Sequence, residues 1–364
     1  MKSRSVSAIA LLVLVFLVLS SCSNAGDGKE GAASADAGAT VKLQGAGASF
    51  PAPLYTKWFK AYSGSHPNVQ IDYQSVGSGS GVKSVMDKTV DFGASDAAMK
   101  PEDMQKVDVG VQLLPMTAGA IVLTYNLKDV PGLKLSRKAY AGIFLGEVKK
   151  WNDPLIAKAN PGLKLPDQPI NVVVRADSSG TTFVFTQHLS AISEKFAKNP
   201  GANNMPNWSV GTKSKGNEGI TASVMTTPGS IGYIEYGYAL SQKLPMAVLE
   251  NKSGEFVTAS TASAAAGLAS ADVPENLIVW APDPAAKEAY PIVTYTWILA
   301  KTKYEDPKVA QRLKEVLRFC LTEGQKFSEK LGYIPLPPDI ANEVLRAVER
   351  INAEESRNAL ALPR

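Results

Sequence analysis

The chain of 364 residues is poor in the side chains that most metal and redox sites require. It has two histidines, His66 and His188, and two cysteines, Cys22 and Cys320. So few of these residues exclude zinc fingers, iron–sulfur clusters and a disulfide framework. They also leave little material for a histidine-based catalytic triad. We therefore expect no metal and no cofactor.

The chain also lacks a surplus of one charge. It has 38 Lys and Arg residues against 34 Asp and Glu, a net charge of +4. Because proteins that bind nucleic acid usually concentrate basic residues far above acidic ones, we expect no nucleic-acid partner. The remaining composition, 45% hydrophobic and 20% charged, is that of a globular protein long enough for about two domains.

The N-terminus has the pattern of an export signal. Two basic residues precede an apolar run from Val6 to Leu19. This run is too short to span a membrane and has the length of a signal-peptide core. It ends in LSSC, which resembles the lipobox of bacterial lipoproteins and has Cys22 as its last residue. We expect residues 1–21 to be removed and Cys22 to be lipidated, which would anchor the exported protein to the lipid bilayer of the cell envelope. A plain secretory signal, with Cys22 left as a thiol, is the alternative.

Residues 22–40 are rich in Gly, Ala, Ser and Asp and show no apolar periodicity, which predicts a flexible linker. Fold prediction therefore begins near Val41. Cys320 is the only cysteine of this body, so the body has no internal disulfide. Its spacing from Leu313 and Val316 predicts a buried helix position.

Strand-like and helix-like segments alternate along the body. Val69, Ile71 and Tyr73 alternate with polar residues, as in a strand, and a helix-like segment follows at 82–86. The same order recurs at 170–174 and 185–192. The pattern predicts an α/β fold. Further strands are expected at 90–94 and 121–123 and a last amphipathic helix at 339–351, whereas 258–271 fits a helix or a loop.

Four polar loops lie between a predicted strand and a predicted helix. They are Gln44–Pro51, Gly77–Gly81, Phe92–Asp96 and Arg175–Thr181. Helix N-termini present unpaired N–H groups, and in an open α/β sheet such turns share one edge, where ligands bind. Many neutral donors and a single arginine suggest a small oxyanion, to which Arg175 would give the charge-assisted contact.

Each loop also has a purely structural interpretation. Ser and Thr before a helix commonly cap it, and Gly77–Gly81 lacks the Walker A pattern. A surface ion pair between Arg175 and Asp177 and a helix cap at Asp96 are further alternatives. The occurrence of four such loops in one α/β body favours the binding site.

Several long motifs occur in an order that is similar to one family. They are GAGASFPAPLYTKW from Gly45, VGSGSGVKSV from Val76, VDFGASDA from Val90, KKWNDPLIAKANPGLKLP from Lys149, VVRADSSGTTFVFT from Val173 and GSIGYIEYGYA from Gly229. Together they resemble the phosphate-binding lipoproteins and periplasmic proteins of bacterial phosphate ABC importers.

The resemblance implies a two-lobed periplasmic-binding-protein fold of type II, with two hinge crossings and a ligand cleft between the lobes. One lobe would comprise residues 40–117 and 294–364, and the other residues 118–293. It also implies a monomeric solute-binding protein, not an enzyme, that delivers inorganic phosphate to the permease and ATPase subunits of an ABC transporter.

The resemblance further implies a set of phosphate-binding residues. Hydroxyl or backbone N–H donors would come from Ser49, Phe50, Ser78, Ser179, Gly180 and Thr181. Arg175 would pair with the anion, and Asp177 would hold Arg175 in place. The family usually has Thr where this chain has Ser49, so the hydroxyl is retained.

Asp96 is the residue that the resemblance assigns to selectivity. A buried carboxylate that faces an anion is repulsive unless the ligand has a proton to donate. Monohydrogen phosphate has such a proton at neutral pH, whereas sulfate does not and would leave Asp96 unpaired. Arsenate, with similar protonation and shape, should be excluded less well.

Two other functions compete with phosphate capture. A secreted serine phosphatase or esterase would need a base, and neither His66, in a turn-like segment, nor His188, on a predicted helix, is well placed to be one. A binder of sulfate, molybdate or tungstate with the same fold is the other candidate, and Asp96 is evidence against it.

Overall fold

A mixed eight-stranded sheet runs through the body of the protein in the part that the structure describes. The computed structural model describes residues 40–269, 271 and 274–353. The predicted signal peptide, Cys22 and the linker up to residue 39 lie outside these residues. The strands of this sheet are β1 (Val41–Gly47), β2 (Val69–Ser75), β3 (Phe92–Ser95), β4 (Val111–Tyr125), β6 (Asn171–Arg175), β7 (Thr212–Ser214), β8 (Ser230–Glu235) and β11 (Val293–Lys301).

The order of the strands is β2-β1-β3-β11-β4-β8-β6-β7. Strands β1, β2 and β3 are parallel, and so are β6, β7 and β8, whereas β4 and β11 run antiparallel to their neighbours. Two smaller sheets contain β5 (Lys134–Leu135), β9 (Val248–Glu250) and β10 (Phe256–Val257), and β12 (Lys303–Tyr304) with β13 (Asn352–Ala353).

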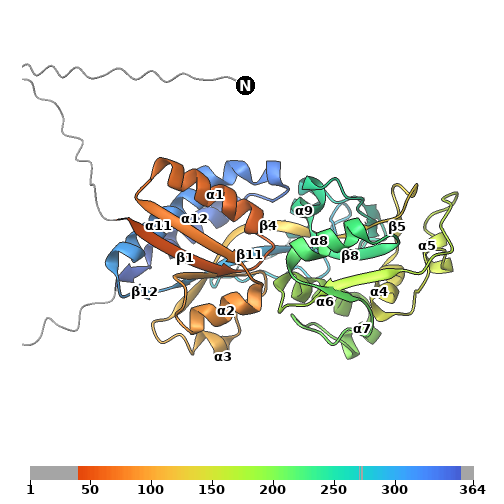
Figure 1. Ribbon diagram of the computed structural model, residues 1–364, viewed down its shortest axis with the longest axis horizontal. Coiled ribbons are helices and arrows are strands. Elements are labelled where there is room, and N and C mark those ends of the chain that lie inside the picture. Colours follow the sequence, from red (N-terminus) through yellow and green to blue (C-terminus); the bar gives the residue numbers. More distant parts are fainter. Residues whose placement is uncertain (1–39, 270, 272–273, 354–364) are drawn as a thin grey trace, which may run out of the picture. The chain divides into compact units, whose positions relative to one another are not determined.

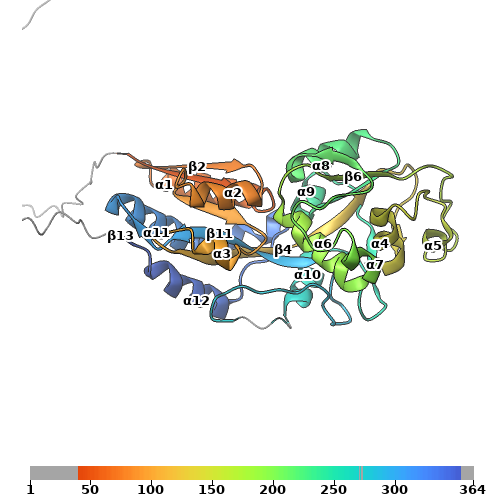
Figure 2. The same ribbon diagram turned by 90° about the horizontal axis from the view of Figure 1, so that it is seen from below.

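Strand β4 links the two halves of the large sheet. Its first part, Val111–Ala120, pairs with β11, and its last part, Ile121–Tyr125, pairs with β8. We call the strands β2, β1, β3 and β11 the first half, and β8, β6 and β7 the second half. Figures 1 and 2 show β4 and β11 between the groups of helices that accompany the two halves.

Helices cover both faces of the first half. Helix α1 packs on β2 and α11, whereas α2 packs on β1 and β3, and Figure 1 shows α1 and α2 on opposite sides of the strands. The helices of this half are α1 (Ala52–Ser65), α2 (Ser78–Met86), α3 (Pro101–Met104), α11 (Pro307–Leu321) and α12 (Pro338–Glu349), with 3-10 turns at Glu323–Phe327 and Glu329–Leu331. Cys320 is fully buried on α11, as its spacing predicts.

The second half carries the helices of the middle of the chain, and α8 packs on both β8 and β6. These helices are α4 (Arg137–Leu145), α5 (Pro154–Ala157), α6 (Gly180–Ile192), α7 (Glu194–Lys198), α8 (Gly216–Thr226) and α9 (Tyr236–Ser241). A further helix, α10 (Thr261–Leu268), packs on the linking strand β4 and on β11. Helix α10 resolves the ambiguity at 258–271 in favour of a helix, which Ser260 and Ser263 start with a reciprocal capping box.

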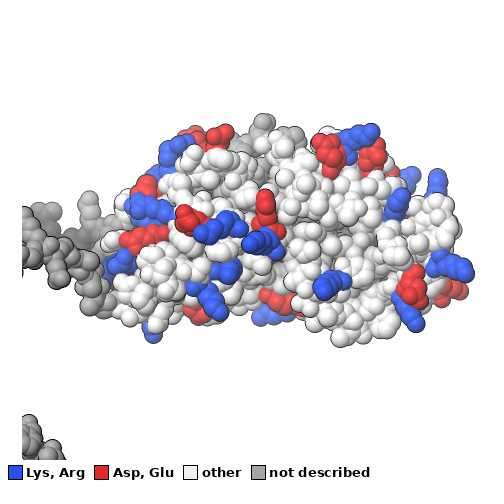
Figure 3. All heavy atoms as spheres, turned by 90° about the horizontal axis from the view of Figure 1, so that it is seen from above, with Lys and Arg blue, Asp and Glu red and all other residues white. Residues whose placement is uncertain are grey.

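Two further features of the described residues are the distribution of charge on the surface and the apolar character of the helices. Basic and acidic side chains are interspersed on the face shown in Figure 3, in keeping with the small net charge. Among the described residues, no helix combines the length and the apolar character that crossing a bilayer requires.

Gly47 ends β1 just before Ser49, with φ at +150°. A Cβ atom there would lie 2.1 Å from the carbonyl oxygen of Ala94 on β3. Gly47→Ala should therefore lower the free energy of unfolding by about 2 kcal/mol or more, because the backbone must move away from β3. Urea denaturation measures this change. Gly64→Ala is the matched control, since a Cβ at Gly64 meets nothing within 4 Å. An equal effect of the two substitutions would contradict the prediction.

Candidate functional site

The polar loops of the two halves meet at the ends of their strands. Ser78, the first residue of α2, accepts a hydrogen bond at its Oγ from the N–H of Gly180, at 3.0 Å. The hydroxyl of Thr181 donates to Oδ2 of Asp96 at 3.3 Å. The N–H of Gly79 donates to the carbonyl of Ser178 at 3.0 Å. The fourth predicted loop, Gln44–Pro51, joins them, because the N–H of Ala48 donates to the carbonyl of Ala94 at 2.9 Å and the N–H of Gly77 to that of Gly47 at 2.8 Å, so all four loops are in direct contact.

Gly180 is one of the points where the two halves approach closely. A Cβ atom on it would lie 2.5 Å from Oγ of Ser78 and 2.7 Å from the backbone nitrogen of Asp96. Both distances are shorter than real Cβ contacts, so only glycine fits at the start of α6 with the halves in this arrangement.

Asp96 lies between the halves, with 1% of its surface exposed. Its Oδ1 accepts a hydrogen bond from the hydroxyl of Thr296 on β11, at 2.8 Å. Burial raises the pKa of Asp96 to about 7, although hydrogen bonds from Thr296 and Thr181 and the charge of Arg175 oppose this rise. The carboxyl group therefore changes charge near neutral pH. It lies within hydrogen-bonding distance of residues from both halves.

Arg175, at the end of β6, forms a bidentate ion pair with Asp177. Its Nε and Nη2 donate to the two carboxylate oxygens of Asp177 at 2.9 Å and 2.5 Å. Burial alone would raise the pKa of Asp177, but the hydrogen bonds and charge of Arg175 and the N–H of Gly216 lower it below its ordinary value. The side chain of Arg175 is 1% exposed, so the alternative of a surface ion pair is wrong.

One nitrogen of Arg175 is not used by this ion pair. Among the described residues, the buried Nη1 has no hydrogen-bond partner. A buried guanidinium donor without an acceptor is costly, and an anion is the acceptor that suits it best. The donor set of this cluster therefore fits an oxyanion.

The serine hydroxyls of the cluster are arranged as donors. Ser78 Oγ accepts from the N–H groups of Gly180 and Asp96, at 3.0 Å and 3.3 Å. Ser179 Oγ caps α6 by accepting from the N–H of Thr182 at 3.0 Å. A hydroxyl whose oxygen accepts from N–H groups still has its own proton to give. The capping interpretation of Ser179 is thus correct, and it leaves the hydroxyl proton free to bind a ligand.

Phe50 is placed by the turn that opens α1. Its side chain is fully buried, and its carbonyl oxygen accepts a hydrogen bond from the hydroxyl of Tyr333 at 2.7 Å. The ring lies close to Gly119 on β4, where a Cβ atom would be 2.9 Å from it. These contacts fix the backbone of Phe50 beside Ser49.

Two residues of the cluster were not expected from the sequence. The sequence does not indicate a role for Thr296 in the site, because threonine is common in strands. Only its position opposite Asp96 in the folded protein distinguishes it from other strand residues. Asn217 follows Gly216 at the start of α8, after β7. A fifth strand–glycine–helix junction of this kind was a usable signal.

The histidines have other partners. The ring nitrogens of His188 are 2.9 Å from the hydroxyl of Tyr140 and 2.7 Å from the carbonyl of Pro282, and burial lowers its pKa to about 4. His66 stacks on Tyr62 at the C-terminal end of α1.

The alternative that Asp96 caps a helix is wrong, since the N-cap of α3 is Lys100.

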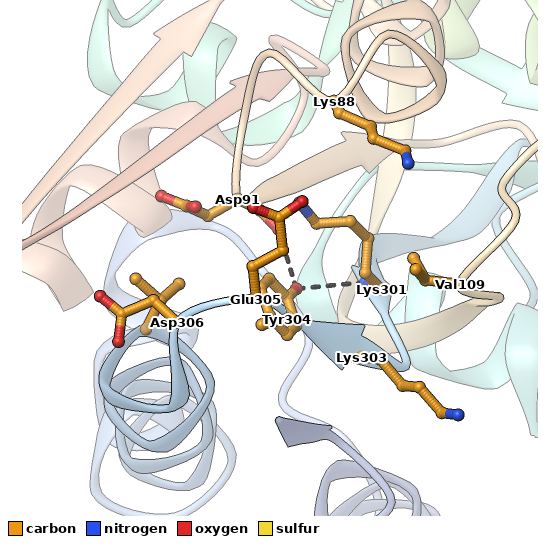
Figure 4. Close-up of a pocket in the computed structure, with 9 residues that line it drawn as sticks. Lys88, Asp91, Val109, Lys301, Lys303, Tyr304, Glu305 and Asp306 are labelled. Carbon is orange, nitrogen blue, oxygen red and sulfur yellow. Dashed lines mark hydrogen bonds between the residues drawn. The ribbon is translucent and has the colours of Figure 1, made fainter. Parts of the chain in front are cut away.

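A separate pocket of about 260 Å³ lies beside β12 (Figure 4). Its central side chain, Tyr304, donates to the carbonyl of Asp91 at 2.8 Å and accepts from the N–H of Lys301 at 3.1 Å. This tyrosine joins β11 to the loop before β3, which is a structural role. The described residues contain no cluster of His, Cys, Asp and Glu suited to a metal ion.

Comparison with known proteins gives the family. Residues 32–323 match the family model of the PBP superfamily domain. The phosphate-binding protein PstS of Haemophilus influenzae is 40% identical over 306 residues, which cover 83% of this chain and 91% of the relative. That of Methanocaldococcus jannaschii is 38% identical over 366 residues, which cover 93% and 94%. The chain belongs to the PstS family of phosphate-binding proteins.

Solved structures agree with this PstS assignment at the level of the fold. A phosphate-bound structure of the high-affinity periplasmic phosphate-binding protein PfluDING has a TM-score of 0.71, with 20% identity, and covers 84% of this chain and 93% of its own. The phosphate-binding protein from Stenotrophomonas maltophilia has a TM-score of 0.68. The predicted family and its α/β periplasmic-binding-protein fold are therefore confirmed, and the PstS relatives are named as binding proteins rather than enzymes.

Asp96→Asn should make the ligand-free protein more stable at alkaline pH. The pKa of Asp96 is about 7 in the folded state and about 4 in an unfolded chain, so the stability contributed by its proton is complete below about pH 4 and is lost as pH rises through 7. Asparagine does not titrate, so the variant does not lose stability in this way. The stability gain of the variant should grow between pH 5 and pH 8, to on the order of a few kcal/mol.

Urea denaturation of phosphate-free protein across this pH range measures the gain. Asp72→Asn, at an exposed position of β2, is the control and should give no such trend. A gain that does not depend on pH would show that Asp96 is not protonated on folding.

Proposed function

We propose that this protein captures inorganic phosphate between its two halves and delivers it to an ABC transporter. The observation that carries the proposal is a buried carboxyl group, Asp96, in the same cluster as the buried and unpartnered Nη1 of Arg175. One group accepts a proton from the ligand and the other donates to it. Monohydrogen phosphate offers both the proton and the acceptor oxygens.

The roles of the other residues follow from their contacts. Ser49, Phe50 and Ser78 bind the anion from the first half, through hydroxyl protons and the N–H of Phe50. Ser179, Gly180 and Thr181 bind it from the N-terminus of α6, where the helix dipole favours an anion. Asp177 orients Arg175. The contacts of Ser78 and Asp96 with Gly180 and Thr181 support this arrangement.

Selectivity against sulfate is assigned to Asp96. Above its pKa of about 7 the carboxylate accepts the proton of monohydrogen phosphate. Sulfate has no proton at this pH, so two anionic oxygens would face each other in a site with little water. Binders of sulfate, molybdate or tungstate therefore fit this cluster poorly. A serine esterase fits poorly too, because both ring nitrogens of His188 are engaged elsewhere.

The size of the ligand sets the expected affinity. Phosphate has five heavy atoms, and at a limit of about −1.5 kcal/mol per atom the binding free energy is roughly −7.5 kcal/mol. The corresponding dissociation constant is on the order of micromolar. This affinity suits a receptor that must capture its ligand and then release it.

Release of phosphate follows from the division of the protein into two lobes. We assign residues 40–117 and 294–364 to one lobe and 118–293 to the other. The change of partner of β4, from β11 to β8 after Ala120, supports a crossing close to this boundary. Because the ligand binds groups of both lobes, it favours their closed arrangement, which the permease and ATPase subunits of the transporter would recognise.

The proposed location is the cell envelope, either in the periplasm or at the outer face of the cytoplasmic membrane. Residues 1–21 direct export, and Cys22 carries a lipid that holds the protein at the bilayer through the linker of residues 22–40. The protein acts as a monomer and without catalytic activity. The LSSC sequence ending at Cys22 supports the lipid anchor.

Isothermal titration with phosphate, sulfate and arsenate at about pH 8 tests the proposal. The native protein should bind phosphate with a micromolar or lower dissociation constant and should give no signal with sulfate. Asp96→Asn should weaken phosphate binding and allow sulfate to bind, because the amide removes the repulsion and can donate to either anion.

Asp72→Asn serves again as the control and should leave both affinities unchanged. If the native protein does not bind phosphate, the proposed function is wrong. If Asp96→Asn still rejects sulfate and retains full phosphate affinity, the role assigned to Asp96 is wrong.

A further inference from the structure

Asn217 joins the two halves within the cluster and is fully buried. It is the second residue of α8, which follows β7 in the second half of the sheet. Its side-chain Nδ2 donates to Oγ of Ser49, from the first half, at 2.8 Å. The same nitrogen is 3.3 Å from Oγ1 of Thr181, and donates to it as well. One amide therefore contacts a hydroxyl from each half.

The orientation of this amide is fixed by the backbone. Oδ1 of Asn217 accepts a hydrogen bond from the N–H of Glu235, at the end of β8, at 2.9 Å. A flipped amide would place its NH₂ group against this N–H, which is a donor, so the flipped form is excluded. Nδ2 must therefore face the two hydroxyls and can only donate to them.

Ser49 consequently has only its hydroxyl proton available for a ligand. Its Oγ accepts from Nδ2 of Asn217 and also from the backbone N–H of Asn217, at 3.0 Å. Two N–H donors occupy both lone pairs of the hydroxyl oxygen. The proton must then point away from Asn217. The hydroxyl of Thr181 is also held, because its oxygen accepts from Asn217, but its proton is already given to Asp96.

We propose that Asn217 is a positioning residue for phosphate, which blocks the hydroxyl oxygens of Ser49 and Thr181 so that the proton of Ser49 is directed at the anion and the proton of Thr181 at Asp96. This proposal rests on the proposed function, since it names a further residue of the same site. An oxyanion needs donors, and a freely rotating hydroxyl spends part of its time presenting an oxygen instead. Asn217 removes that orientation and also ties Ser49 to the second half.

A double-mutant cycle with Ser49 tests the proposal. Asn217→Ala should weaken phosphate binding by about tenfold or more in the native background, as expected for losing oriented donors. In the Ser49→Ala background the same substitution should cost much less, because one of the hydroxyls that it positions is gone. Isothermal titration with inorganic phosphate gives the four dissociation constants.

Asn160→Ala is the matched control. Asn160 is another buried amide, and it bonds to the backbone of Lys134 and Ile156, which are not residues of the proposed site. The control should lower stability without changing the affinity for phosphate. It separates the loss of a buried amide from the loss of a positioning group.

The outcomes distinguish this proposal from the proposed function. A native protein that does not bind phosphate contradicts the function itself. Native binding together with an equal cost of Asn217→Ala in both backgrounds overturns the role of Asn217, because a merely structural residue would act independently of Ser49. Strong coupling between the two positions supports it.

Asn217→Asp covers the case in which the alanine variant does not fold. Below its pKa the introduced carboxyl group has one donor and one acceptor, so it can replace the hydrogen bond to Ser49 but not also the one to Thr181. Relative to native protein, phosphate affinity should be partly restored at about pH 5 and fall towards pH 8. The absence of recovery at low pH would overturn the proposal.

Discussion

The site depends on a carboxyl group that is removed from water next to an anion-binding cluster. Asp96 is buried, and its oxygens have hydroxyl partners on Thr296 and Thr181. Burial disfavours its charge, so in the proposed function a proton shared with the ligand would relieve a cost that the fold itself imposes. This constraint gives a reason for an acidic side chain among the donors of the proposed site.

The same constraint explains the charge balance of the cluster. The charge of Arg175 is offset by Asp177, and Asp96 adds a further negative charge when it is ionised. Net attraction between opposite charges is therefore not what would hold the anion. Oriented dipoles must do so: the start of α6, the hydroxyls whose oxygens already accept from N–H groups, and the free Nη1 of Arg175. The interspersed charges of the surface in Figure 3 fit a receptor that selects by hydrogen bonding.

Local chemistry made much of this architecture predictable. Apolar periodicity located β2, β6 and α12 closely, but β4 begins at Val111, well before the strand expected at 121–123, and α2 begins at Ser78, inside the glycine-rich loop that was expected to precede it. The four polar loops could be found because Gly and Ser at strand–helix junctions have a recognisable composition. Thr296 could not be assigned in this way, whereas the strand–glycine–helix junction at Asn217 could have been found but its partner could not. The contacts of Thr296 with Asp96 and of Asn217 with Ser49 depend on the insertion of β11 beside β3 and on the approach of α8 to the turn before α1, which are long-range arrangements.

The most direct test of the central claim is a high-resolution crystal structure of the protein with phosphate at about pH 8. The account predicts one phosphate oxygen in a short hydrogen bond to the carboxylate of Asp96, of about 2.5–2.7 Å, and another oxygen bonded to Nη1 of Arg175. Phosphate bound outside this cluster, or bound within it without any contact to Asp96, would contradict the account.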